Sequence, residues 1–214
     1  MKQLIIIGAG GFGREVLGWA QESTAYRKEW EIAGFLDDRP EAIGMAYGID
    51  LPLLGNTMDY QPKSEDVLIC AVGNPVQRAE MRRRFTERGG IFTRVIHESC
   101  VVGRNVELGQ GVILCPRVVL TCDLSIGENT ALNVASAVGH DAWIGSDCQI
   151  SSFCDLTGHV RVGDSVMMGS RVSVLPGRSI GDNAIVGAGS VVVSDVPESV
   201  TVFGNPAKIL KRHP

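Results

Sequence analysis

The chain has 214 residues, of which 44% are hydrophobic and 21% charged, so it is long enough for two small globular domains. Its net charge of −4 provides no basic footprint for nucleic acid, and no apolar run approaches the roughly 20 residues that a membrane-spanning helix needs. The start of the chain lacks the features of a signal peptide, and the six cysteines have no zinc-binding spacing. We therefore expect a cytoplasmic protein with reduced thiols and no metal.

The first predicted elements are a short apolar strand at residues 3–7, the run Gly-Ala-Gly-Gly-Phe-Gly at 8–13, and a helix after it. This order of strand, glycine loop and helix is the context in which G-x-G-x-x-G indicates phosphate binding. Glycines let the backbone approach phosphate closely, and the helix N-terminus offers free N–H groups. We therefore expect Gly10, Gly11 and Phe12 to contact a bound nucleotide.

Two further strands are predicted to end in polar loops. The strand at 31–36 runs into Asp37, Asp38 and Arg39, and the strand at 67–72 runs into Gly73 and Asn74; a helix at about 77–88 and a strand near 91–95 follow. Ligands bind at the carboxyl edge of open α/β sheets, so these polar residues are candidate substrate contacts. Each loop alone is equally consistent with ordinary turn chemistry, whereas the three loops together favour nucleotide binding.

The predicted α/β domain spans residues 1–95. Dinucleotide-binding folds use two mononucleotide-binding halves, and this segment has room for only one. A mononucleotide or a nucleotide sugar therefore fits the domain better than NAD does.

A six-residue repeat dominates the second half of the chain. From Ile96 to Val192, every sixth residue is aliphatic or Met, which makes 17 positions in one unbroken register. The next position is Gly in nine of these hexads, and the fifth position is mostly small or β-branched. This pattern predicts a triangular coil over residues 96–197, with three hexads in each turn of 18 residues and a tail at 198–214. Successive turns would stack as parallel strands about 4.8 Å apart.

The array resembles the left-handed β-helix of the hexapeptide acyltransferases. With the Rossmann-like half before it, the whole chain resembles the bacterial sugar O- and N-acetyltransferases, typified by the sialic acid and bacillosamine enzymes, and the ending 204–208 matches their C-terminal motif. The resemblance implies a left-handed coil, against the general right-handed preference. It also implies a homotrimer with acetyl-CoA between neighbouring coils. The acetyl-CoA contacts that the resemblance implies are Gln149, Gly158, Ala188, Pro206 and Lys208.

One hexad corner carries a candidate general base. His140 takes the third position of its hexad, where side chains leave the coil, and Asp141 follows it. An imidazole can accept a proton from an attacking amine or hydroxyl near neutral pH, and a carboxylate can fix its tautomer. The catalytic histidine of the family and its carboxylate fall at these two positions; the alternative is a solvated turn residue. His159 lies 18 residues after Asp141 and is a candidate ionic partner.

Other candidates follow from the same 18-residue stacking. Gly158 lies one turn above His140, where its N–H would stabilise the oxyanion of a thioester under attack. Asn133 resembles the acceptor-binding asparagine of the family, although a turn asparagine explains it equally well. Direct transfer needs no nucleophilic cysteine, so Cys122, one turn below His140, is interpreted as a bystander.

The favoured function is N-acetylation of a nucleotide-linked amino sugar, because it explains the nucleotide-binding features. The alternative is O-acetylation of a sialic acid or related sugar. Hypotheses from other classes are a nicotinamide-dependent reductase, supported only by the glycine motif, and a scaffold without catalytic activity. Phe12 departs from the bacillosamine enzymes, which carry a histidine at this position.

Overall fold

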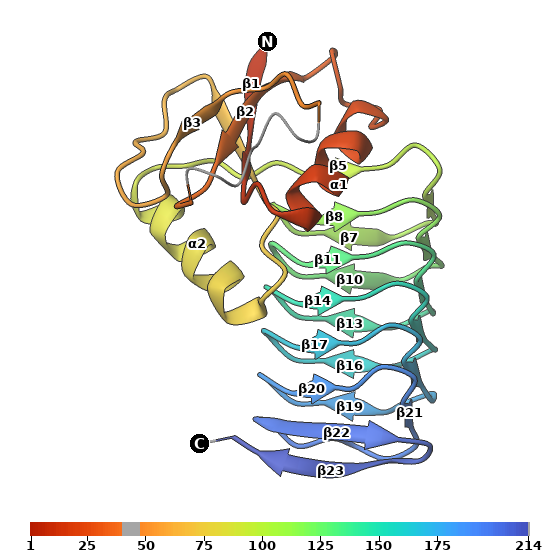
Figure 1. Cartoon of the computed structure of the whole chain (residues 1–214). Helices are drawn as coiled ribbons and strands as arrows, with labels where there is room; N and C mark the ends of the chain where they lie inside the picture. Colours follow the sequence, from red (N-terminus) through yellow and green to blue (C-terminus); the bar gives the residue numbers. More distant parts are fainter. Residues whose placement is uncertain (40–47, 214) are drawn as a thin grey trace.

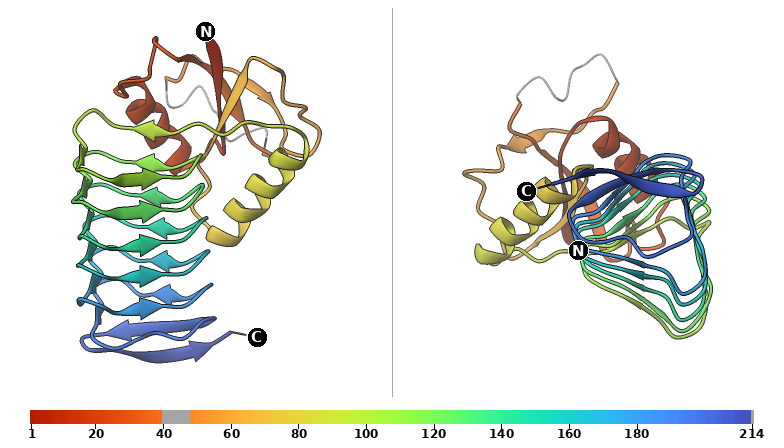
Figure 2. Two further views of the ribbon diagram at one scale, coloured as in Figure 1. Left: turned by 180° about the vertical axis from the view of Figure 1, so that it is seen from behind. Right: turned by 90° about the horizontal axis from the view of Figure 1, so that it is seen from below.

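The computed structural model describes residues 1–39 and 48–213 and shows an α/β domain on one end of a long triangular coil (Figure 1). This architecture confirms the predicted fold class, a Rossmann-like domain followed by a left-handed parallel β-helix. Figure 2 shows the coil from behind and along its length, where its three flat sides enclose a single interior.

The α/β domain contains a parallel sheet with the strand order β3-β2-β1-β4. Its elements are β1 (Lys2–Ile7), α1 (Gly11–Gln21), β2 (Trp30–Leu36), β3 (Leu53–Gly55), β4 (Asp66–Cys70) and α2 (Pro75–Glu87). The short strand β3 was not predicted. The strand expected near 91–95 is wrong, because Phe92 forms only an isolated bridge to Leu68, and the next strand belongs to the coil.

The coil has three faces, each a parallel sheet that runs along its length. The first face contains β5 (Val95–Ile96), β8 (Ile113–Leu114), β11 (Ala131–Leu132), β14 (Gln149–Ile150), β17 (Met167–Met168), β20 (Ile185–Val186), β22 (Val200–Gly204) and the antiparallel β23 (Ala207–Arg212). The second face contains β6 (Val101–Val102), β9 (Val119–Leu120), β12 (Ala137–Val138), β15 (Asp155–Leu156), β18 (Ser173–Val174) and β21 (Val191–Val192). The third face contains β7 (Val106–Leu108), β10 (Leu124–Ile126), β13 (Trp143–Ile144), β16 (Arg161–Val162) and β19 (Ser179–Ile180).

The hexad pattern explains this shape residue by residue. The repeated aliphatic position fills the interior and is buried in every hexad from Leu114 to Val192, whereas Val102 at the open first turn is 43% exposed. The fourth position turns the corner in the left-handed region of backbone conformation, as at Asp141 with φ +57° and His159 with φ +59°. Repetition of both features stacks equivalent residues of successive turns directly above one another.

The α/β domain and the coil share a core. Leu4, Ile6 and Val16 pack in one cluster with Ile113 and Ala131, which lie on the first face of the coil. This apolar contact covers the start of the first face, so the domain and the coil are joined by packing as well as by the chain.

Arginines of α2 add polar contacts to the junction. Arg82 forms ion pairs with Asp147 at 2.7 Å and with Glu128 at 3.1 Å. Arg78 is fully buried and donates to the carbonyl of Asn129 and to Oε1 of Gln149. These bonds attach α2 to the corner between the third and first faces.

The far end of the coil closes with a hairpin. β22 pairs with β20 in the first face, and β23 pairs antiparallel with β22, so the sheet extends past the predicted end of the coil at residue 197. No helix in the described parts of the chain is long and apolar enough to span a membrane.

Candidate active site

The glycine loop needs glycine at two of its positions for steric reasons. Gly8 adopts φ +97°, and a Cβ on Gly13 would lie 2.0 Å from the carbonyl oxygen of Gly8, so both positions need glycine. Gly10 precedes the first turn of α1, and no side chain caps this helix end and no acidic residue stands in its first turn. The N–H groups of Gly11 and Phe12 are therefore free of a local capping side chain and available to an anion.

Asp37 organises the loop and its surroundings. Its buried carboxylate accepts from the N–H of Ala9 at 2.8 Å and from the guanidinium of Arg39 at 3.0 and 3.1 Å. Burial opposes ionisation of this carboxyl, but the bonds from Arg39 and Ala9 outweigh it and lower the pKa of Asp37. Asp37 therefore holds the glycine loop and Arg39 in place, rather than presenting a free carboxylate to a ligand.

The strand ends surround a cleft of about 840 Å³. Its lining includes Gly10, Gly11, Phe12, Asp37, Asp38 and Arg39, as the sequence predicted. Thr57 and Arg84 also line the cleft and were missed. The side chain and N–H of Thr57 bond to Asp38, and Arg84 donates to the Thr57 hydroxyl.

Asn74 does not line this cleft. Its side chain accepts from the N–H of Gln77 and caps α2, which is the ordinary role of an asparagine before a helix. A second hollow of about 720 Å³ between the domain and the coil contains none of the predicted site residues.

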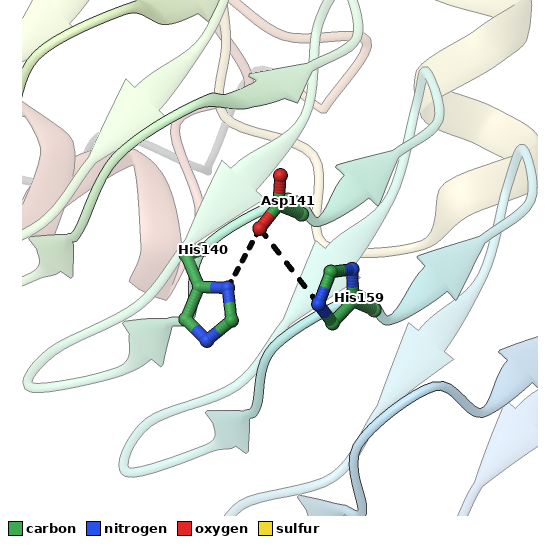
Figure 3. A group of neighbouring side chains, drawn as sticks. All are labelled: His140, Asp141 and His159. Carbon is green, nitrogen blue, oxygen red and sulfur yellow. Dashed lines mark hydrogen bonds and ion pairs between the residues drawn. The ribbon is translucent and has the colours of Figure 1, made fainter.

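His140, Asp141 and His159 meet at one corner of the coil, between the second and third faces (Figure 3). Nδ1 of His140 lies 2.7 Å from Oδ2 of Asp141, and Nε2 of His159 lies 3.8 Å from the same oxygen. The side chains are 57%, 50% and 63% exposed, respectively. When Nδ1–H donates to the carboxylate, Nε2 of His140 is left as a base that faces solvent.

Gly158 lies directly above His140, as predicted. A Cβ on Gly158 would lie 2.7 Å from Nε2 of His140, so only glycine leaves the ring in this position. At comparable corners the N–H of Ser146 or Asp164 donates to an aspartate one turn above. Within the described residues the N–H of Gly158 has no such acceptor, because Pro176 stands in the corresponding place.

Cys122 and Asn133 contribute no chemistry to this corner. A hydrogen bond to Asp123 and burial both raise the pKa of the Cys122 thiol, which disfavours a nucleophilic thiolate. Asn133 lies at the corner between the first and second faces, where its side chain accepts from the N–H of Val134. One chain therefore does not bring Asn133 to His140.

The predicted acetyl-CoA contacts are dispersed. Gln149 is buried at the domain junction against Arg78, which gives it a structural role in place of the expected cofactor contact. Ala188 is exposed at the corner between the first and second faces, whereas Gly158 lies at the corner that carries His140. Pro206 and Lys208 are exposed on the terminal hairpin.

Comparisons with known proteins match both halves of the chain. Residues 3–85 match the family model of the PglD N-terminal domain, and residues 159–194 match a hexapeptide repeat of succinyl-transferase. A crystal structure of PerB from Caulobacter crescentus in complex with CoA and GDP-perosamine is 31% identical, with a TM-score of 0.84 over 99% of this chain and 98% of that one.

Other relatives agree over the full length. The acetyltransferase domain of PglB from Neisseria gonorrhoeae, solved with acetyl coenzyme A, is 29% identical with a TM-score of 0.88 over 98% of this chain and 99% of that one. A GDP-perosamine N-acetyltransferase of Escherichia coli O157:H7 is 28% identical over 98% of this chain and 96% of its own.

Acetyltransferase relatives from Saccharomyces cerevisiae and Bacillus subtilis are matched over only 27% and 54% of their own lengths.

Proposed function

Because the chain belongs to the hexapeptide-repeat sugar acetyltransferases, the family of the perosamine N-acetyltransferases, we propose that it transfers an acetyl group from acetyl-CoA to the amine of a nucleotide-linked amino sugar. The observation that carries this proposal is the His140–Asp141 pair at an exposed corner, next to the N–H of Gly158, which has no acceptor among the residues that the structure describes. These groups supply a base and an oxyanion donor at one place.

The transfer is direct. The neutral amine attacks the carbonyl carbon of the thioester, and Nε2 of His140 takes the proton that the amine loses. The N–H of Gly158 donates to the oxygen of the tetrahedral intermediate. The C–S bond then breaks, and the CoA sulfur leaves as a thiol with the proton carried by His140.

The cleft of the α/β domain suits the nucleotide part of the acceptor. The free N–H groups at the start of α1 favour a diphosphate, and the cation of Arg39 lies beside Gly10, at 3.5 Å from the position of a Cβ there. A free sugar such as sialic acid would leave this cleft without a use, which favours N-acetylation of a nucleotide sugar over the alternative.

We infer that a complete site needs two chains. The α2 helix, which lines the cleft, is attached to the corner between the third and first faces, while His140 lies at the corner between the second and third. Gly158 and Ala188 also occupy different corners, so one acetyl-CoA would touch both only at the junction of two coils. A cyclic trimer provides three such junctions.

The test is an assay of the purified protein with acetyl-CoA and a panel of UDP-, dTDP- and GDP-linked amino sugars, with free sialic acid as a comparison. We expect one nucleotide amino sugar to gain an acetyl group on nitrogen, as shown by mass spectrometry and NMR. Acetylation of sialic acid at a higher kcat/KM would replace this proposal with the O-acetyltransferase alternative.

A further inference from the structure

Two histidines converge on one carboxylate oxygen. Oδ2 of Asp141 is 2.7 Å from His140 and 3.8 Å from His159, and the two imidazole rings are 5.1 Å apart in an edge-to-face arrangement (Figure 3). The base function of His140 uses only one of these contacts. His159 has no part in the transfer as described above.

The coil itself builds this convergence. Asp141 and His159 occupy the same corner position of successive turns, and the N–H of His159 donates to the carbonyl oxygen of His140 at 2.8 Å. The distance between the two histidines therefore follows from the stacking of successive turns, and it does not depend on a long, flexible side chain. Gly158, between them, keeps the space above His140 clear.

We propose that His159 is a positioning residue that shares the Asp141 carboxylate with His140 and places a second ionisable ring beside the base. This inference rests on His140 acting as the base in the proposed function. A protonated His159 competes for Oδ2 and repels a second positive charge nearby, so it disfavours protonation of His140. A neutral His159 still places its ring beside the carboxylate, with Nε2 3.8 Å from Oδ2, and so limits the rotation of Asp141.

Charged side chains on the adjacent turns of this corner form pairs of their own, and Arg161, two residues after His159, is exposed. One turn below, Asp123 interacts with Asn105 at 2.8 Å and Arg104 at 3.8 Å, beside the protonated thiol of Cys122. One turn above, Arg178 lies 3.8 Å from Asp195. Exchange of His159 alters the charge beside Asp141 and leaves these neighbouring pairs in place.

Two substitutions separate the roles of His159. His159→Gln keeps an N–H donor at a similar place but cannot carry a charge, and His159→Leu removes both. We expect the acid limb of the kcat/KM profile to move up by about half a pH unit in both variants, since unit charges some 5 Å apart interact weakly in water. Plateau kcat should fall less in His159→Gln than in His159→Leu, and His213→Gln in the tail serves as the matched control with an unmoved profile.

A double substitution tests the route through Asp141. In an Asp141→Asn background, His159→Leu should lower plateau kcat no further, because the shared carboxylate is gone. Additive losses, or acid limbs that superimpose on that of the unmodified enzyme, would overturn the inference.

NMR titration of the free protein gives a readout without activity. The His140 resonance should reach half-protonation at a higher pH in His159→Gln than in the unmodified protein. An unchanged midpoint would refute the sharing of Asp141 even in an active enzyme. A shifted midpoint in a protein that acetylates no sugar would instead support the contact between His159 and Asp141 but reject the proposed function.

Discussion

At the scale of single residues, two glycines on successive turns of the coil, Gly139 and Gly158, are glycine for different reasons. A Cβ on Gly158 would meet only the exposed side chain of His140, whereas a Cβ on Gly139 would lie 2.6 Å from the backbone nitrogen of Gly158. An imidazole can swing away into solvent, and the backbone of a stacked turn cannot. Gly158 is therefore required for the geometry of the site, and Gly139 is required for the stacking of the coil.

Alanine at each position should separate these roles. Gly158→Ala should keep the melting temperature within a few degrees but lower kcat at least about 10-fold, because the methyl group displaces His140. Gly139→Ala should lower the free energy of unfolding by more than about 1 kcal/mol. Thermal melts and steady-state kinetics on both variants check this pair; full activity in Gly158→Ala would contradict the placement of the base.

His140 itself offers the most direct test of the mechanism. General-base assistance contributes about 10²–10⁴-fold, so His140→Ala should lower kcat by a factor in that range. Because the side chain is 57% exposed, its loss opens no cavity and should leave the melting temperature nearly unchanged. Kinetics and calorimetry on the same preparation provide the check, and loss of folding together with activity would reveal a structural histidine instead.

The sequence predicted which residues gather at this corner but not how they bond. The 18-residue stacking placed Gly158 above His140 and His159 above Asp141, because a coil with fixed register converts spacing directly into contact. The cap formed by Asn74 and the buried contact of Gln149 with Arg78 were not predictable in this way. Each depends on where α2 begins and docks, which no local repeat encodes.

At the scale of elements, the ends of β1 and β2 form one unit through Asp37. Asp37→Ala removes the acceptor for Ala9 N–H and releases Arg39 from the glycine loop. We therefore expect a raised KM for the nucleotide sugar and little change in the KM for acetyl-CoA. Steady-state kinetics with each substrate varied in turn would measure both, and an equal rise in the two values would contradict separate binding sites.

The lowered pKa of Asp37 also predicts how the domain responds to acid. A carboxyl whose pKa is lower in the folded state stabilises that state above its ordinary pKa, and the stabilisation is lost as pH falls through the folded value. The unmodified protein should therefore lose more stability than Asp37→Asn between about pH 5 and pH 2. Chemical denaturation across this range is the measurement; parallel curves would indicate that folding does not lower the pKa of Asp37.

The coil was easier to predict than the domain that precedes it. Each hexad carries its own aliphatic residue and its own corner, so the repeated pattern identifies the coil from the local sequence alone. The strand β3 has only three residues, and the segment near Phe92 has the composition of a strand but only one bridge. In these places long-range pairing decides the structure, and the local sequence carries little of that information. The i, i+4 spacing of Arg78 and Arg82 on α2 was the available signal for its contact with the coil.

At the scale of the whole molecule, the arrangement of corners predicts complementation between chains. His140→Ala and Asp37→Ala variants each lack one half of the machinery. If sites form between chains, random mixed trimers should contain an intact site at about a quarter of their junctions. Unfolding and refolding the mixture at sub-saturating acceptor should restore activity toward that fraction of the unmodified level.

The same mixing distinguishes the alternative directly. If the cleft and His140 of one chain served each other, no chain in the mixture would carry both intact halves, and activity would stay at the sum of the separate variants. Refolded samples of each variant alone are the matched controls.

Successive turns of the coil are evenly spaced, so distances along its axis change in steps of one strand spacing. Gly158 and Gly204, where β22 ends and the turn of the terminal hairpin begins, are about two and a half turns apart, which corresponds to roughly 12 Å along the coil axis. Every whole turn inserted or removed between them would change this span by one strand spacing of about 4.8 Å without rotating the catalytic corner. Under the proposed function, the number of 18-residue turns would therefore set how far from the reacting carbon a hairpin that binds acetyl-CoA could hold the rest of the acyl donor.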